Sequence, residues 1–254
     1  MDEGLYGRFF AIEERYWWSV GTRRLFFALL DGLALRRTAR VLDVGCGTGI
    51  MLHELAARFD APLGLDYSAL ALQFCRQRGL RGLARGDATR LPYATDALDL
   101  VLALDVVEHL DDDGACLAEL ARVCRPGGHV LVHVPAFPFL WSDKDVLNHH
   151  RRRYRRAALR RLVTGAGLQV RHLTHFNTTV FPLAAGLALT RRERAPGAAA
   201  DAPAAAASLD TLYGLPAPLN AALTGMLGLE GRLARRLALP FGMSLVCLAR
   251  KPHA

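Results

Sequence analysis

Apolar and polar positions alternate along the chain with two periods, one typical of strands and one typical of helices. Several short apolar runs have the length of buried strands. They are Val41–Val44, Pro62–Asp66, Ala97–Leu104 and His129–Val134. The intervening segments carry apolar residues three or four positions apart, as Leu52, Leu55 and Phe59 do, which is the period of an amphipathic helix. Strands that alternate with helices build parallel sheets, so the pattern predicts a doubly wound α/β fold.

Both ends of the chain add further elements. Residues 1–36 are expected to be helical because leucine and phenylalanine recur there at helical spacing. Two more strands are expected, at Gly167–Thr174 and at Met243–Arg250. Between them lie an apolar stretch at 178–189, an alanine-, proline- and glycine-rich run at 195–207 that is expected to be a flexible loop, and a helix at about 218–237.

Glycines 45, 47 and 49 follow the first apolar run and precede a helical pattern. Glycine admits positive φ and lets a ligand approach the backbone closely, while the N–H groups of the new helix point at that ligand. A dinucleotide fingerprint would need a third glycine at Ile50, and a phosphate loop would need lysine and a hydroxyl residue where Ile50 and Met51 stand. The loop therefore matches neither of those motifs.

The segment Val41-Leu-Asp-Val-Gly-Cys-Gly-Thr-Gly49 resembles motif I of the class I S-adenosylmethionine (SAM) methyltransferases. Within that family it is similar to the group that continues with L-D-V-x-E-H, as Leu104–His109 does here. The resemblance covers residues 38–136. It implies a Rossmann-like sheet of seven strands, parallel except for one antiparallel strand near the C-terminus, and SAM as the cofactor.

Two acids agree with an adenosine ligand. Asp66 ends the second expected strand, 19 residues after Gly47, where a carboxylate accepts from both ribose hydroxyls. NAD enzymes use the same position, so Asp66 supports adenosine and not the reaction. The resemblance places Asp87 at the adenine amino group and the N–H of Ala88 at the ring. The expected cofactor-binding set is Asp43, Gly45, Cys46, Gly47, Gly49, Asp66, Tyr67, Asp87, Ala88, Leu104 and Asp105.

The resemblance also implies that the N-terminal helix caps the cofactor. Trp18 lines the site in this interpretation, and Arg23 or Arg24, with Arg24 preferred, meets the methionine carboxylate. The alternative is that Trp17 and Trp18 only pack this helix on the core.

The segment after the fifth strand looks like the substrate-facing insertion of one methyltransferase subgroup, with the pattern P-A…L-W-S-x-x-D…H-x-R-R-Y. It leads through Val146–Tyr154 into a helix. His150 is a candidate general base, because imidazole accepts a proton near neutral pH. The candidate catalytic residues are His150 and Tyr154, and the candidate substrate-binding residues are Trp141, Asp145 and Arg153. The alternative keeps His150 and Tyr154 as ties between lid and body, since methyl transfer proceeds by alignment without a strong base.

Other acids have simpler explanations. Glu108 and His109 are adjacent and point in different directions, which favours structural bonds over a catalytic pair. Asp111–Asp113 suit the start of a helix, so no metal is expected.

Composition and charge limit the remaining classes. A hydrophobic content of 52% suffices for a full core. The N-terminus lacks the pattern of a signal peptide, and the five cysteines show no CxxC spacing, so a reduced, cytoplasmic setting is expected. The net charge is +8, but seven arginines lie at 151–161, and without them it falls to about +1. Solvated helix faces explain most of these arginines, although an anionic acceptor or a membrane surface would also suit them. Only Tyr154 interleaves them, which argues against single-stranded nucleic acid.

The sequence thus predicts a helical cap at 1–36, a SAM-binding core at 37–136, a substrate-facing lid at 137–166, and the last two strands at 167–254 with an apolar helical insertion at 177–241. The expected function is SAM-dependent methylation of an oxygen on a small or lipid-like hydrophobic or aromatic acceptor. Methylation of nitrogen or carbon, or of protein or RNA, stays open. NAD-dependent oxidoreductases and nucleic-acid-binding modules are the rival classes. The insertion fits core packing, an acceptor cover, a homodimer interface or a peripheral membrane contact, being too short to span a bilayer.

Overall fold

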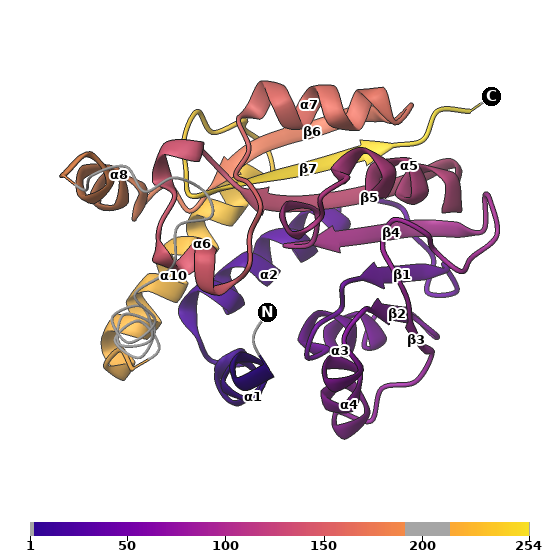
Figure 1. Ribbon diagram of the computed structural model, residues 1–254, viewed down its shortest axis with the longest axis horizontal. Coiled ribbons are helices and arrows are strands. Elements are labelled where there is room, and N and C mark those ends of the chain that lie inside the picture. The colour runs from indigo at the N-terminus through magenta and orange to yellow at the C-terminus, as the bar shows by residue number, and fades with distance from the viewer. Residues whose placement is uncertain (1–2, 191–213, 254) are drawn as a thin grey trace. The chain divides into compact units, whose positions relative to one another are not determined.

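The computed structural model describes residues 3–190 and 214–253 (Figure 1). The alanine- and proline-rich run predicted at 195–207 lies outside them. The chain forms two compact units. The cap unit comprises Met1–Gly32, Pro135–Arg155 and Thr174–Leu245, and the sheet unit comprises Leu33–Val134, Arg156–Leu173 and Val246–Ala254. The four segments predicted from the sequence stay a prediction.

Seven strands form one sheet in the order β3-β2-β1-β4-β5-β7-β6. Their bounds are β1 Val41–Val44, β2 Leu63–Asp66, β3 Leu83–Arg85, β4 Leu98–Leu104, β5 Cys124–Pro135, β6 Gln169–Phe176 and β7 Ser244–Arg250. The pairs β3–β2, β2–β1, β1–β4 and β4–β5 are parallel. β7 runs antiparallel to β5, since Gly127 bonds to Lys251 at one end and Ala136 to Met243 at the other. The predicted Rossmann-like fold is confirmed.

Burial explains the central strands. β1 is buried throughout, and β4 is buried at most positions, as expected for parallel strands covered on both faces. The helices of the sheet unit are α3 Ile50–Ala56, α4 Ala69–Gln77, α5 Asp113–Val123 and α7 Arg156–Gly165, with a 3₁₀ turn at Val107–His109. The hydroxyl of Ser68 accepts from Ala71 N at the start of α4, and the carboxylate of Asp112 accepts from Ala115 N at the start of α5. The predicted helix starts are therefore confirmed.

The largest error in a predicted strand boundary is at the start of β5, and β6 lies two residues beyond its predicted range. β5 begins at Cys124, whereas the sequence predicted His129, because Arg125–Gly128 looked like a helix stop. Gly127 takes a φ of 77° there, and its N–H donates to Lys251 O, so the turn residues form an irregular stretch of the strand.

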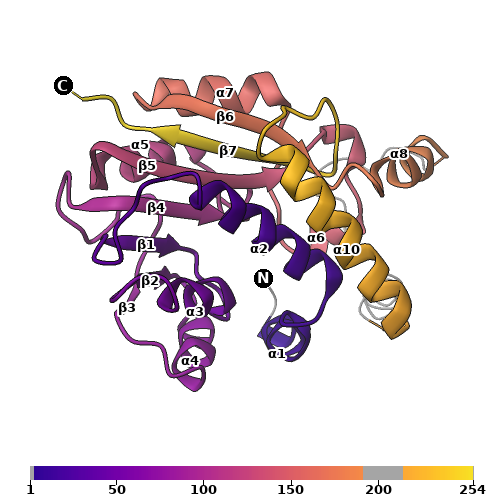
Figure 2. The ribbon, with the colours of Figure 1, turned by 180° about the vertical axis from the view of Figure 1, so that it is seen from behind.

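Helices dominate the cap unit. They are α1 Glu3–Ile12, α2 Trp17–Leu30, α6 Asp143–Leu147, α8 Phe181–Thr190 and α10 Ala217–Ala234, with a 3₁₀ turn at Pro138–Leu140. α2 and α10 pack side by side (Figure 2). The close approach depends on Gly21, where a Cβ would lie 2.5 Å from the Cβ of Leu227. Asn220 of α10 accepts from Trp17 N at 2.9 Å, which satisfies the start of α2. Across the described ranges, no helix combines the length and the apolar character that crossing a membrane requires.

Candidate functional site

The glycine loop joins β1 to α3 and leaves open space at one position. All three glycines have positive φ. A Cβ at Gly45 would strike Val106, and one at Gly49 would strike Cys75, so these two glycines are required by packing. Gly47 has a φ of 54° but nothing within 4 Å of where its Cβ would lie. The Gly47 backbone is therefore open to the close approach of a ligand.

Asp66 lies at the carboxyl end of β2 beside this loop. Its Oδ2 accepts from Gly47 N at 2.9 Å and its Oδ1 from Ser68 N at 2.8 Å. A carboxylate offers about four acceptor positions, so capacity for a pair of hydroxyls remains. Burial raises the pKa of Asp66, and the N–H groups of Ser68 and Gly47 offset part of that rise.

Asp43 lies one strand away, inside β1, and is only 2% exposed. Burial, reinforced by the charge of Asp66, raises the pKa of Asp43 to about 8. The sheet unit thus brings two carboxyl groups of raised pKa to the edge where parallel sheets bind ligands.

The other expected adenosine contacts lie on neighbouring loops. Asp87 is exposed, and its Oδ1 accepts from the N–H and the hydroxyl of Thr89, both at 2.8 Å. Ala88 is buried. The Tyr67 side chain is 73% exposed, and the Arg85 guanidinium lies over its ring at 5.9 Å.

Asp105 directly follows β4 and has a strained backbone conformation, with a φ of 55°. Its N–H donates to His133 O, and His133 Nδ1 lies 2.9 Å from its Oδ1. His133 is the β5 residue opposite Leu104. His133 is not among the site residues predicted from the sequence, although a histidine near the end of the predicted strand His129–Val134 was a usable signal.

The cap unit contains a cluster around the Asp145 carboxylate, which is 1% exposed. His150 Nδ1 lies 2.9 Å from Oδ1, and Arg153 donates from Nε to Oδ1 at 2.8 Å and from Nη2 to Oδ2 at 3.0 Å. The backbone N–H and the hydroxyl of Ser142 also donate to Oδ2. Burial acts to raise the pKa of Asp145, but the hydrogen bond from His150 and the charge of Arg153 outweigh it and hold the pKa below its usual range. These contacts favour a positioning role for Asp145 and Arg153 over direct contact with an acceptor.

Tyr154 and Trp141 flank this cluster. Tyr154 is buried. Its backbone N–H donates to Pro135 O, and its carbonyl accepts from Phe137 N, so these two bonds join the two ends of the segment 135–154. Trp141 is half-buried, and its indole Nε1 has no hydrogen-bond partner among the residues described.

Trp18 and Arg24, the two cofactor contacts expected from the N-terminal helix, both lie on α2. Trp18 is half-buried, with Lys144 Nζ over its ring at 5.6 Å. Arg24 is exposed, whereas Arg23 is buried and donates to Glu13 O. Of the two arginines, only Arg24 keeps an exposed side chain that a ligand can reach.

Comparison with known proteins shows which family the sheet unit resembles. Residues 42–132 match the family model described as a methyltransferase domain. A Mycolicibacterium smegmatis protein described as a probable S-adenosylmethionine-dependent methyltransferase is 33% identical over 162 residues, covering 62% of this chain and 61% of that protein. Residues 42–132 are therefore a methyltransferase domain of the SAM-dependent kind. A domain of this kind implies SAM as the cosubstrate.

Two further comparisons agree with this methyltransferase domain. A demethylmenaquinone methyltransferase of a Mycobacterium species is 42% identical over 93 residues, 37% of this chain and 40% of that protein. The solved S-adenosylmethionine-dependent methyltransferase of Mesorhizobium loti shares the fold, with a TM-score of 0.56 at 18% identity over 89% of this chain and 97% of that chain. This chain spans between two fifths and about three fifths of the length of these curated relatives.

The residues of the methyltransferase domain fit SAM. The open backbone at Gly47 admits a close ligand, and Asp66 beside it retains acceptor capacity. The contacts of the individual residues with SAM stay predictions.

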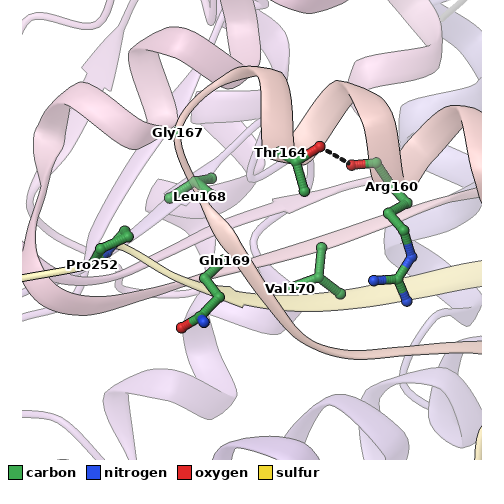
Figure 3. A pocket seen from close by; sticks show the side chains of 7 residues that line it. All are labelled: Arg160, Thr164, Gly167, Leu168, Gln169, Val170 and Pro252. Carbon is green, nitrogen blue, oxygen red and sulfur yellow. Dashed lines mark hydrogen bonds between the residues drawn. The ribbon is translucent and has the colours of Figure 1, made fainter.

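A surface pocket of about 470 Å³ lies elsewhere on the sheet unit (Figure 3). It is lined by Arg160, Thr164, Gly167, Leu168, Gln169, Val170 and Pro252. Thr164 Oγ1 donates to Arg160 O at 3.0 Å within it. The pocket lies at the amino end of β6 and contains none of the predicted site residues, so it is separate from the candidate site.

Proposed function

We propose that this protein transfers the methyl group of SAM to an oxygen of a small or lipid-like, hydrophobic or aromatic acceptor. The observation that carries the proposal is the segment Pro135–Arg155, which holds an oriented histidine and contributes Phe137 and Phe139 to an aromatic cluster. Bonds between Tyr154 and both Pro135 and Phe137 close this segment into a loop. A proton acceptor and part of an apolar wall on one loop suit a hydroxyl group attached to an apolar body.

The aromatic cluster consists of Phe137, Phe139, His175, Phe181 and Phe241. The rings of Phe137 and His175 stack, with centroids 5.0 Å apart and an interplanar angle of 7°. Phe181 contacts Phe137 at 5.4 Å and Phe241 at 5.3 Å. Phe139 and Phe241 remain 45% and 43% exposed. Partly exposed aromatic rings supply apolar contact area at low entropic cost, which supports an aromatic or lipid-like acceptor.

His150 is positioned to accept a proton. The Asp145 carboxylate accepts from Nδ1, so the proton of the neutral ring lies on Nδ1 and Nε2 carries the acceptor lone pair. Arg153 holds Asp145 in place through two bonds. When bound, SAM supplies an activated methyl group, for which in-line alignment provides most of the acceleration. His150 then removes the proton that the acceptor oxygen loses.

The relatives named demethylmenaquinone methyltransferases support the lipid-like character of the acceptor. They say less about the methylated atom, so methylation of carbon or nitrogen is an outcome to be tested.

The test incubates the purified protein with methyl-labelled SAM and a bicyclic phenol, or the same ring system without a hydroxyl. The phenol should be labelled as its methyl ether, and the hydroxyl-free ring should stay unlabelled. Label on the hydroxyl-free ring would show that carbon is the methylated atom, not oxygen. Label found only in added protein or RNA would overturn the proposed class of acceptor.

A matched pair of histidine variants tests the base. His150→Ala should lower kcat by about 10²- to 10⁴-fold, the usual contribution of a general base. His149→Ala is the control, because His149 is adjacent, exposed and outside the cluster. Equal rates in both variants would refute the role of His150. Asp145→Asn should change the pH dependence of kcat more than it changes KM, because Asp145 acts through His150.

A further inference from the structure

The large exposed apolar side chains gather in the cap unit. Of those in the described residues, Tyr67 alone belongs to the sheet unit. The others are Phe139, Leu183, Leu187, Leu189, Leu219, Met226, Leu229, Leu233, Leu237 and Phe241. Leu183 and Leu189 of α8 are 70% and 83% exposed, and α8 has no charged residue. A concentration of this kind marks an interaction surface.

Helix α10 has two apolar faces, where a surface helix ordinarily has one. Leu227, Gly231 and Ala234 are buried, and Leu227 and Gly231 pack on α2. Core packing explains this first face. A second stripe, Met226, Leu229, Leu233 and Leu237, repeats at three and four residues along α10 and just beyond it, and its members are 45% to 65% exposed. We call this second stripe the outer stripe.

The exposed charged side chains beside the outer stripe are all positive. Arg232, Arg235 and Arg236 are all exposed. The acid of α10, Glu230, is buried, and its carboxylate accepts from Thr178 N at 2.9 Å. The described residues 217–241 therefore present exposed cations next to exposed leucines without an exposed acid.

We propose that the outer stripe and its three arginines dock the cap unit on the surface of an anionic lipid membrane. Leucine side chains enter the boundary between headgroups and acyl chains, and arginines bind the headgroup phosphates. A second copy of this chain suits the surface less well, because an isologous dimer would bring both sets of arginines together without opposing acids. The inference goes beyond the methyl-transfer proposal and does not rest on it.

The experiment is cosedimentation of the full chain with phosphatidylcholine vesicles, with and without phosphatidylglycerol. The protein should bind only the anionic vesicles, and raising the salt should weaken the binding. Replacing Arg232, Arg235 and Arg236 together by Gln should weaken vesicle binding at least tenfold. Replacing Leu229 and Leu233 by Ser should weaken it similarly while leaving the charge unchanged.

The matched control replaces Arg76, Arg81 and Arg161 by Gln. These arginines are exposed in the sheet unit, so the control makes the same change in net charge elsewhere. The control should bind as the parent does. Equal losses in the two arginine triples would show general charge attraction and overturn the proposal, as would failure of the parent to bind anionic vesicles. Vesicle binding needs no methyl transfer, so either proposal can fail without the other.

Discussion

Replacing Gly47 by Ala has two effects that can be measured separately. Backbone strain lowers the stability of the fold, and the added methyl group hinders the close approach of a ligand. Gly47 has a φ of 54°, and an alanine in this left-handed region costs about 1–2 kcal/mol of stability. Such a loss lowers the melting temperature of a chain of this size by only about 2–8 °C. Because nothing within 4 Å meets the new methyl group, the fold itself has room for it. The methyl group instead fills the space that we assign to SAM.

S-adenosylhomocysteine affinity measured by calorimetry should therefore fall sharply. Overpacking a close contact costs about 1–3 kcal/mol, which corresponds to a dissociation constant roughly 5- to 150-fold higher. Gly79→Ala is the matched control, since Gly79 has a φ of 76°, equally open space and a position in the turn after α4. It should lose similar stability and keep its affinity. Equal affinities in both variants would refute the assignment of the loop to the cofactor.

Three further predictions concern stability and reactivity. Because the pKa of Asp43 is raised to about 8, the fold should lose stability as the pH rises from about 4 to 8. The Asp43→Asn variant should melt at a higher temperature than the parent at pH 8 and at the same temperature at pH 4. A parent melting temperature that does not change with pH would contradict this prediction. At about 1.4 kcal/mol per unit, the difference at pH 8 is on the order of 5 kcal/mol as an upper bound. In urea titration, Gly21→Ala should lower the free energy of unfolding by about 1–3 kcal/mol, because the new methyl group disturbs the packing of α2 on α10. Gly225→Ala, in open space on α10, should leave that free energy unchanged or raise it slightly. Similar losses in both variants would argue against that packing. Burial raises the pKa of Cys247 to about 12, so this thiol should resist alkylation at pH 8 until denaturant is added, and rapid labelling would contradict its burial.

The elements that sequence predicted well are those with local causes. The near-continuous apolar run of β4 and the caps at Ser68 and Asp112 depend on residues close in sequence. The start of β5 was missed because its irregular stretch is completed by Lys251, more than a hundred residues later. Local turn chemistry at Pro126 and Gly127 favoured a stop, and long-range pairing overrode it.

The candidate site divides in the same way. Spacing along the chain made the glycine loop and Asp66 candidates for a nucleoside site, and the resemblance to motif I assigned them to SAM. The contacts of Asp145 could not be predicted, because burial and the bidentate bond from Arg153 arise only when the loop closes. The stacking of Phe137 on His175 joins residues from two separate segments, so no local pattern announces it.

The most direct test of the account is transfer of a labelled methyl group from SAM to a hydrophobic phenol, followed by extraction and identification of the product. The account predicts a methyl ether in the organic phase, formed by the parent protein and by Gly79→Ala and strongly reduced in Gly47→Ala and His150→Ala. Label confined to protein or RNA, or a product formed equally by all four proteins, would contradict it.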